Sequence, residues 1–588
     1  MILQALTSLY EALAPKGEVP KEGWSREKIS FALGIDENGD LLRITPLFKP
    51  GDMPKGKKKE EPQEMTVPAA VKRTSGAAAN FLWDNSSYIL GVSLKKGEDD
   101  AEREKRRNKD IKCFEACREL HHSMLAGMEY PAAKAVLNFL DKWEPQKAEE
   151  NNLVAQYAKE ILSGANMVFR FNGGYVHDDP QLASVWQKAN AKQKDNIGQC
   201  LVTGALDEIQ KTHPTIKGVQ GAQSSGAALV SFNASAFCSY NKEQNQNAPV
   251  GKYAAFAYTT ALNHLLADRK NVHRIGDAAV VCWAENADKQ YEDFAAEVFF
   301  GDNVDKSDEQ RLLALRTSLK LLADGLPCKE MDLDPDRKFY ILGLSPNAAR
   351  LAVRFFYCDS FGKIAGNIYK HHERLEIVRP SYDKFPILPL WKLLSATVNP
   401  NAKDKTPNAA MAGAVARAVF SGGRYPASLL ECTFLRIKAE RNITRERAAI
   451  IKAYYLRNPN EKCPKEVLTV SLNENSKNIP YTLGRLFSVY EEIQQAANPG
   501  INTTIKDRYF GSAAAMPATV FPILSNLAQK HLRKLSDAQR VYLDKKVMTL
   551  KSVLGEQYPA HMSLPEQGSF DLGYYHQTQA RYTKKEDK

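Results

Sequence analysis

Residues 217–249 read KGVQGAQSSGAALVSFNASAFCSYNKEQNQNAP, and this stretch guides the interpretation of the whole chain. Its first ten residues include three glycines and two adjacent serines. Glycine adopts positive φ angles without a steric penalty, so such a loop can point several backbone amides at one ligand. The next residues, AALVSFN, are short, apolar and partly β-branched, which predicts a strand.

Amide side chains recur along the same stretch, at Gln220, Gln223, Asn233 and 244–247. Amides and glycine-rich backbone suit phosphate groups and base edges better than they suit bond-making chemistry. The sequence therefore favours a nucleic-acid contact here. The alternative is a Gly/Ser loop that only turns the chain.

One string in this stretch resembles an enzyme motif. AQSSG, residues 222–226, differs by one residue from the G-x-S-x-G nucleophile elbow. That elbow needs a strand before the serine and a helix after it, whereas here a loop precedes and a strand-like run follows. A serine hydrolase that uses Ser224 with His264 or His273 is therefore a disfavoured alternative. The sequence contains no Walker A motif and no H-E-x-x-H.

A second polar turn lies nearer the N-terminus, in VKRTSGAAAN at residues 71–80. It combines a cation, two hydroxyls, a glycine and an amide, the groups that contact phosphates and bases. These candidate residues are Arg73, Thr74, Ser75, Gly76 and Asn80.

Strand and helix signals divide the chain into two portions. Residues 1–385 mix both: a helix is expected near residues 2–13, a hairpin around Asn38-Gly39, and a buried strand in DAAVVCWAEN. Beyond residue 386 strand signals nearly vanish, and Ala- and Leu-rich segments alternate with short breaks. The sequence thus predicts an α+β fold, with a mixed α/β portion (1–385) followed by an all-helical bundle (386–588).

The positive charge is concentrated in the last third of the chain. The whole sequence has 80 Lys+Arg and 69 Asp+Glu. Residues 401–588 hold 28 basic and 17 acidic residues, whereas residues 1–400 hold 52 of each. A local excess of this kind indicates a polyanionic partner, of which nucleic acid is the commonest. The alternative is a basic surface that is only solvated.

No cofactor, metal site or membrane segment is predicted. Nine dispersed cysteines are typical of reduced thiols in a cytoplasmic protein, and Cys113 and Cys117 are expected to pack rather than bind a metal. His177, Asp178 and Asp179 are interpreted as a surface turn. No run approaches 18 apolar residues, and no signal peptide is expected.

Several long motifs occur in a characteristic order: MILQALTSLYEAL, RTSGAAANFLWDN, HPTIKGVQGAQSSGAALVSFN, FYILGLSPNAARLAVRFF, LGRLF, DRYFGSA and LGYYHQ. Together they resemble the large subunit of the type I-C CRISPR interference complex (Cascade), over residues 1–579. The resemblance implies a non-catalytic subunit of an antiviral, RNA-guided ribonucleoprotein. It implies recognition of the protospacer-adjacent motif in duplex DNA, help in opening the duplex into an R-loop, and retention of the displaced strand.

The resemblance also implies a set of partners. They are the guide RNA with its 5′ handle, the target double-stranded DNA, the repeated backbone subunits, the RNA-handle-binding subunit, small helical subunits and the helicase-nuclease effector. On this interpretation the mixed portion recognises the flanking motif and docks into the complex, while the basic bundle resembles the small subunit of related complexes. The competing interpretation is a nucleic-acid-binding scaffold of another ribonucleoprotein.

Two groups of DNA-contacting residues follow as hypotheses. The motif-reading loops would use Arg73, Thr74, Ser75, Gly76, Asn80, Lys217, Gly218, Gln220, Gln223, Ser224 and Ser225. The displaced strand would follow Arg436, Lys438, Arg441, Arg445, Arg447, Arg485, Lys506 and Arg508, of which some are expected to pair internally or face other subunits.

Overall fold

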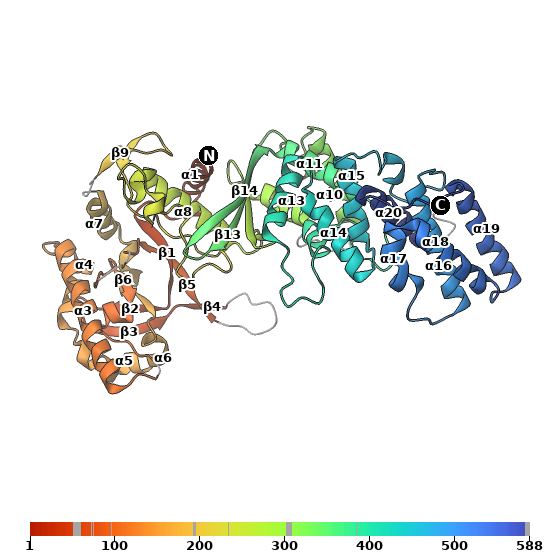
Figure 1. The fold of residues 1–588 in the computed structure, drawn as a ribbon. Coiled ribbons are helices and arrows are strands. Elements are labelled where there is room, and N and C mark those ends of the chain that lie inside the picture. The colour runs from red at the N-terminus through yellow and green to blue at the C-terminus, as the bar shows by residue number, and fades with distance from the viewer. Residues whose placement is uncertain are drawn as a thin grey trace. The chain divides into compact units, whose positions relative to one another are not determined.

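The computed structural model describes residues 1–50, 60–71, 73, 76–95, 97–191, 196–232, 234–301, 309–383 and 385–582. The chain forms two compact units (Figure 1). The first comprises residues 1, 3–214 and 232–261, and the second comprises residues 2, 215–231 and 262–588. Helix α8 (Lys252–Ala267) runs from the first unit into the second.

The first unit is built on two small sheets. One has the order β3-β2-β7-β6, with β8 beside β7; β2 and β7 run parallel and the other pairs run antiparallel. The other has the order β1-β5-β4. The strands are β1 (Trp24–Ile29), β2 (Phe31–Ile35), β3 (Leu41–Pro46), β4 (Phe48–Pro50), β5 (Glu60–Pro68), β6 (Trp83–Asn85), β7 (Asn166–Phe171) and β8 (Gly174–Tyr175).

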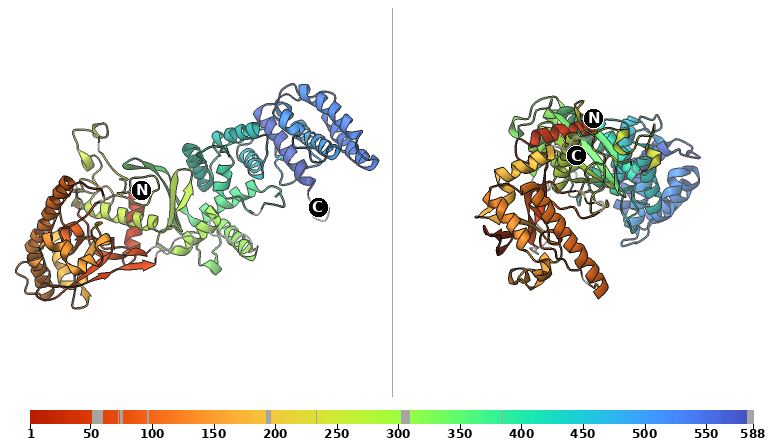
Figure 2. Two further views of the ribbon diagram at one scale, coloured as in Figure 1. Left: turned by 90° about the horizontal axis from the view of Figure 1, so that it is seen from below. Right: turned by 90° about the vertical axis from the view of Figure 1, so that its left-hand side faces the viewer.

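Helices surround these sheets, and Figure 2 shows the long α3 along one side of the unit. A short hairpin, β9 (Ile197–Gln199) with β10 (Leu206–Glu208), completes it. The helices are α1 (Ile2–Leu13), α2 (Ser86–Ile89), α3 (Asp100–Leu125), α4 (Pro131–Lys142), α5 (Asn152–Ala155), α6 (Ala158–Ile161) and α7 (Pro180–Ala191).

The second unit begins with an antiparallel sheet of order β11-β12-β13-β14. Its strands are β11 (His273–Ile275), β12 (Ala278–Ala284), β13 (Lys338–Asn347) and β14 (Arg350–Ser360), and the helices α9 (Lys289–Ala295), α10 (Glu309–Ala323) and α11 (Phe361–Leu375) accompany it. One hydrophobic core extends from Ile275 on β11 to Tyr575 near the C-terminus. The sheet and the following helices therefore share a single core.

From residue 390 to residue 580 the described secondary structure is helical apart from one isolated bridge. The helices are α12 (Leu390–Ser395), α13 (Ala409–Ser421), α14 (Ala427–Glu440), α15 (Arg445–Arg457), α16 (Ile479–Ala497), α17 (Ile505–Ala515), α18 (Pro517–Leu532), α19 (Asp537–Leu554) and α20 (Leu564–Ala580). The predicted α+β class, with a helical C-terminal portion, is confirmed. The predicted boundary at 385/386 lies inside the second unit and stays a prediction.

Two glycines bring α16 and α20 into backbone contact. A Cβ atom at Gly484 would lie 1.9 Å from the carbonyl oxygen of Phe570, and one at Gly573 would lie 2.1 Å from that of Tyr481. Only glycine permits this approach. The crossing explains why LGRLF and LGYYHQ each contain a glycine: both are interface positions of the same helix pair.

Local predictions hold in three places and fail in one. The first helix, the hairpin at Asn38-Gly39 and the buried strand β12 are confirmed. The strand predicted for AALVSFN is wrong: over its described residues, 227–232, only isolated bridges form, Ile216 with Ala227 and Ala228 with Arg350, and Asn233 lies outside the described residues. The bridge to β14 consists of two hydrogen bonds of Ala228, one to the Ala349 carbonyl oxygen and one from the Leu351 N–H, at the start of that strand. It does not extend into a ladder, so β-propensity alone does not make a strand here.

None of the described helices combines the length and the apolar composition needed to cross a membrane.

Candidate nucleic-acid interface

The glycine-rich loop of residues 217–226 belongs to the second unit. Gly218, Gly221 and Gly226 have φ angles of +90°, +86° and +98°. A Cβ at Gly226 would lie 2.8 Å from Thr215, so a larger residue would clash there. The positive φ angle also disfavours any other residue at this position. The sequence-based expectation of positive φ angles at these glycines is therefore confirmed.

Helix α8 fixes the start of this loop. The Asn263 side chain accepts a hydrogen bond from the Lys217 backbone N–H at 2.8 Å and donates one to the Thr215 carbonyl oxygen at 3.1 Å. The Lys217 side chain itself is exposed. The loop is thus held through its backbone, which leaves the lysine available to a ligand.

The far side of the loop exposes polar side chains. Gln223, Ser224 and Ser225 are exposed and make no side-chain hydrogen bond to the residues that the structure describes. Gln220 differs, because its Oε1 accepts a hydrogen bond from Arg274 Nη1 at 2.9 Å. Of the two predicted base-contacting glutamines, Gln223 is free to reach a ligand and Gln220 is restrained.

The hydrolase alternative finds no support around Ser224. Residues 227–232 form no helix after the serine, and no strand precedes it in residues 215–223. His273 is buried, and its ring stacks on Phe300 with centroids 3.8 Å apart. The strand–serine–helix geometry of a nucleophile elbow is absent from these described residues.

Arg73 lies at the base of the first predicted loop, in the first unit. Its Nη2 donates to Asp84 Oδ2, and its Nε donates to the Ala78 carbonyl oxygen at 2.7 Å. Its guanidinium lies 3.9 Å from the centre of the Tyr88 ring. Burial raises the pKa of Asp84, and the bond to Arg73 opposes that shift. Arg73 therefore holds the ends of the loop together through these contacts.

The other residues of this loop differ in accessibility. Asn80 is 4% exposed, and its Oδ1 accepts from the Val71 N–H at 2.9 Å. A contact between Asn80 and a nucleobase would require this hydrogen bond to break. Gly76 is exposed with φ +81°, and a Cβ there would meet no atom within 4 Å. Thr74 and Ser75 lie outside the described residues.

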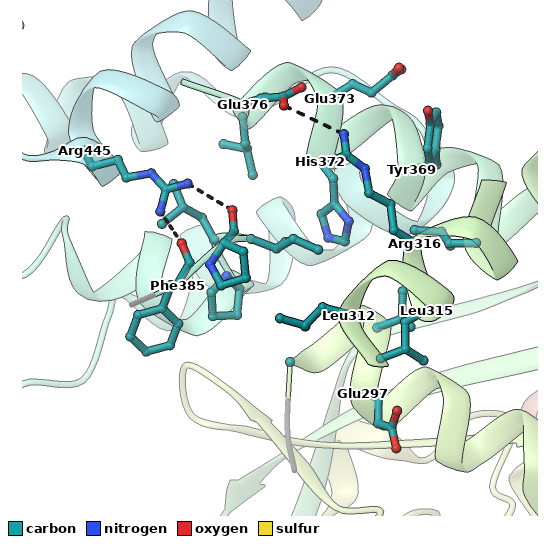
Figure 3. A pocket seen from close by; sticks show the side chains of 18 residues that line it. Glu297, Leu312, Leu315, Arg316, Tyr369, His372, Glu373, Glu376, Phe385 and Arg445 are labelled. Carbon is teal, nitrogen blue, oxygen red and sulfur yellow. Dashed lines mark hydrogen bonds and ion pairs between the residues drawn. The ribbon is translucent and has the colours of Figure 1, made fainter. Parts of the chain in front are cut away.

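Three of the eight cations predicted for the displaced strand are buried, namely Arg445, Arg447 and Arg485. Arg445 Nη1 pairs with Asp383 Oδ2 at 3.0 Å, and its guanidinium also donates to two backbone carbonyls (Figure 3). Arg447 Nη2 pairs with Glu440 Oε2 at 2.6 Å. Arg485 donates to the Gln577 side chain and to backbone carbonyls. These three arginines stabilise the bundle. This agrees with the expectation that some of the eight cations pair internally.

Four others gather where α14 ends and α17 begins. We name them the cationic patch: Lys438, Arg441, Lys506 and Arg508. Lys506 Nζ donates to Asn442 Oδ1 at 3.3 Å, which joins the two segments although 64 residues separate them. All but the partly buried Lys506 are exposed, and burial lowers the pKa of Lys506. The remaining cation, Arg436, pairs with Glu440 at 3.5 Å.

A cavity of about 120 Å³ lies between α10, α11 and residues 385–389 (Figure 3). Its wall is largely apolar, and both of its arginines are paired: Arg316 with Glu376 at 3.8 Å, and Arg445 with Asp383. Burial lowers the pKa of His372 to about 4, so this imidazole is uncharged at neutral pH. The cavity is therefore poorly suited to a phosphate.

No cluster of three or more His, Cys, Asp or Glu side chains within the described ranges could hold a metal ion. Cys113 and Cys117 are buried, and burial raises the pKa of both thiols.

Sequence reasoning missed the residues that hold the two loops. Asp84 and Tyr88 anchor the first loop, and Asn263 and Arg274 anchor the second. The Trp-Asp-Asn string at residues 83–85 was a usable signal, since an Asp within an apolar run must find a partner when buried. Asn263 and Arg274 lie about 40 residues or more beyond their loop and gave no local signal.

Comparison with known proteins agrees with the motif pattern. The family model of the CRISPR-associated protein (Cas_Csd1) matches residues 6–582, nearly the whole chain. A search of curated proteins found no match. The chain therefore belongs to the Cas_Csd1 family of CRISPR-associated proteins, the family of the type I-C Cascade large subunit.

Proposed function

We propose that this chain is the non-catalytic subunit that recognises the protospacer-adjacent motif in duplex DNA and helps to open the target. The observation that carries the proposal is the glycine-rich loop of residues 217–226. Its backbone is twisted by three positive-φ glycines and anchored by Asn263, and it leaves Lys217 and Gln223 exposed. A loop of this kind can enter a groove closely while its side chains reach phosphate and base edges.

The two ends of this loop would have different tasks. Lys217 would hold a phosphate, which positions the loop without reading sequence. Gln223 would contact a base edge or wedge the first base pair, and one such contact discriminates by about 1–3 kcal/mol. Gln220 would support the loop through Arg274. In the first loop, Gly76 lies in the exposed part, and Arg73 and Asn80 hold the loop in place through their hydrogen bonds.

The cationic patch would hold the displaced strand. Its exposed cations lie on α14 and α17 or, for Arg441, directly after α14, in the portion in which the excess positive charge is concentrated. Phosphate contacts of this kind are independent of sequence and weaken as salt rises. Arg445, Arg447 and Arg485 are left out of this role because their guanidiniums are buried and bonded.

Membership of the family supports a wider set of partners within the same proposal. They are the guide RNA, the backbone and handle-binding subunits, the small helical subunits and the recruited helicase-nuclease, all in the cytoplasm. Guide pairing would read the target itself, as in other RNA-guided effectors.

The test uses the assembled complex and a library of target duplexes with randomised flanking bases. We expect the wild-type complex to enrich one short motif and Gln223→Ala to lose part of that preference. Gln181→Ala, an exposed glutamine on α7, is the matched control and should enrich like the wild type. Equal enrichment by Gln223→Ala and the wild type would remove this loop from motif reading.

A further inference from the structure

The loop of residues 234–249, in the first unit, holds a bulky residue in a backbone conformation that suits glycine. Tyr240 has φ +53°, and Asn241 after it has φ +55°. The Lys242 N–H donates to the Ser239 carbonyl oxygen at 3.0 Å, which closes a β-turn with both central residues at positive φ, as in type I′. We name residues 239–242 the tyrosine turn. Such turns favour Asn and Gly, so Asn241 is expected there and Tyr240 is not.

Two asparagines maintain this conformation. Asn247 Oδ1 accepts from the Ser239 N–H at 2.9 Å, and its Nδ2 donates to the Lys242 carbonyl oxygen at 3.0 Å. One amide group therefore connects both ends of the tyrosine turn. The buried Asn245 fixes the stem of the loop, because its Nδ2 donates to the Gln210 carbonyl oxygen at 2.6 Å. These bonds offset the unfavourable φ angle of Tyr240.

The ring of Tyr240 contributes nothing to the fold that would explain this strain. It is 95% exposed, and it makes no hydrogen bond or ring contact with the residues that the structure describes. A tyrosine that stabilises a fold buries its ring and bonds its hydroxyl. Backbone strain that the surrounding residues maintain is concentrated at functional sites. The tyrosine turn therefore presents a fixed aromatic surface to a ligand.

The polar groups beside the ring fit a nucleic-acid strand. Asn241 and Lys242 are exposed, and Lys242 forms no ion pair within the described ranges. Glu243 is the only acidic residue of the loop, and its carboxylate is occupied by a capping box, in which it accepts the Gln246 backbone N–H. Bases stack on rings of this kind, and ammonium groups contact phosphates. The core of a protein interface is instead apolar and poor in charge.

We propose that Tyr240 stacks on an unpaired base of the displaced DNA strand, with Lys242 on a neighbouring phosphate. The target strand pairs with the guide, so the bases left unpaired after opening belong to the displaced strand. Stacking accepts any base, because every base has a π-face. This inference rests on the proposed function, in which opening of the duplex exposes that strand. It adds a contact that neither the motif-reading loops nor the cationic patch includes.

The experiment uses the assembled complex on target duplexes whose displaced strand carries 5-iodouracil at one position at a time. Long-wavelength ultraviolet light cross-links this base to an aromatic side chain that stacks on it, and peptide mapping identifies the residue. We expect the wild type and Tyr240→Phe to cross-link at residue 240, since both have the ring. Tyr240→Leu should lose the cross-link and bind the target about fivefold more weakly or worse, whatever the flanking motif. The matched control is Tyr382→Leu, at a tyrosine that is 83% exposed outside this loop, and it should bind like the wild type.

Tyr240→Gly separates the backbone strain from the contact. Glycine adopts this φ angle without a steric penalty, so the variant should melt at or above the wild-type temperature. It should nevertheless lose the cross-link and the affinity as Tyr240→Leu does. A clearly lower melting temperature would show that the ring stabilises the fold, and it would overturn the inference.

A parallel arm places 5-iodouracil in the guide RNA. Cross-linking of residue 240 to the guide and not to the displaced strand would overturn the inference, as would an equal loss of binding in Tyr382→Leu. If Tyr240→Leu binds normally while Gln223→Ala loses motif preference, the stacking contact is refuted and the proposed function stands. If residue 240 cross-links to the displaced strand while the wild type prefers no flanking motif, motif recognition is refuted and the stacking contact stands.

Discussion

Replacing Gly484 by alanine should destabilise the second unit, although alanine is the better helix former. In an exposed helix this change would stabilise by up to about 1 kcal/mol. Here the new Cβ would lie 1.9 Å from the Phe570 carbonyl oxygen and 2.8 Å from the Tyr574 backbone nitrogen. Carbon–oxygen contacts normally need about 3.3 Å, so α16 and α20 must separate by more than 1 Å.

Separation of the two helices would strain several buried hydrogen bonds. The Tyr481 hydroxyl lies 2.9 Å from His576 Nδ1, and the Tyr574 hydroxyl donates to Glu491 Oε2 at 2.6 Å. Overpacking of this kind costs about 1–3 kcal/mol, and the obstructing atoms are backbone atoms that cannot rotate away. We therefore expect a net loss of about 1–3 kcal/mol in the free energy of unfolding.

The assay is thermal unfolding followed by circular dichroism, with Gly511→Ala as the matched control. Gly511 lies inside α17, and a Cβ there would meet no atom within 4 Å. The control should melt at the wild-type temperature or slightly above it, whereas Gly484→Ala should melt several degrees lower. If both variants melt at or above the wild-type temperature, the proposed backbone contact between α16 and α20 is refuted.

The remaining predictions concern charge and pH. Arg445→Ala should lower the melting temperature, because it breaks a buried ion pair, which costs about 3–5 kcal/mol. Arg441→Glu should leave the melting temperature unchanged and weaken DNA binding for every sequence alike. The reverse pattern would contradict the assignment of Arg445 to stability and of Arg441 to DNA binding. Asp84→Asn should release Arg73 and speed tryptic cleavage there, and unchanged cleavage would deny the anchoring role. Burial lowers the pKa of His576 to about 3 and that of His121 to about 4, below the value of about 6.5 in an unfolded chain. The unfolded chain therefore binds more protons between those values, and stability should fall from pH 7 to pH 5, by about 2 kcal/mol per histidine; a melting temperature equal at both pH values would refute this.

Local signals predicted the elements whose cause is local. The hairpin of β2 and β3 follows from Asn38-Gly39, because Gly39 adopts φ +82° and two apolar runs flank it. The helical C-terminal portion follows from apolar spacing over long segments. AALVSFN failed because a strand needs a neighbour, and the geometry places only Ala228 beside β14.

The candidate site was only partly predictable for a similar reason. Sequence identifies a cation but not its partner, so Arg441 and Arg445 looked alike although one is exposed and the other pairs with Asp383, 62 residues away in the chain. The glycines of the second loop were identified correctly, because positive φ angles favour glycine wherever the rest of the chain lies.

The most direct test of motif recognition is permanganate reactivity of thymines beside the flanking motif, measured on target duplexes bound by complexes assembled with and without this chain. With the chain present, we expect the first base pairs to become reactive only next to the enriched motif, and Gln223→Ala to weaken that dependence. Equal opening of correctly and wrongly flanked targets, or full opening by complexes that lack this chain, would contradict its role in recognising the motif and opening the duplex.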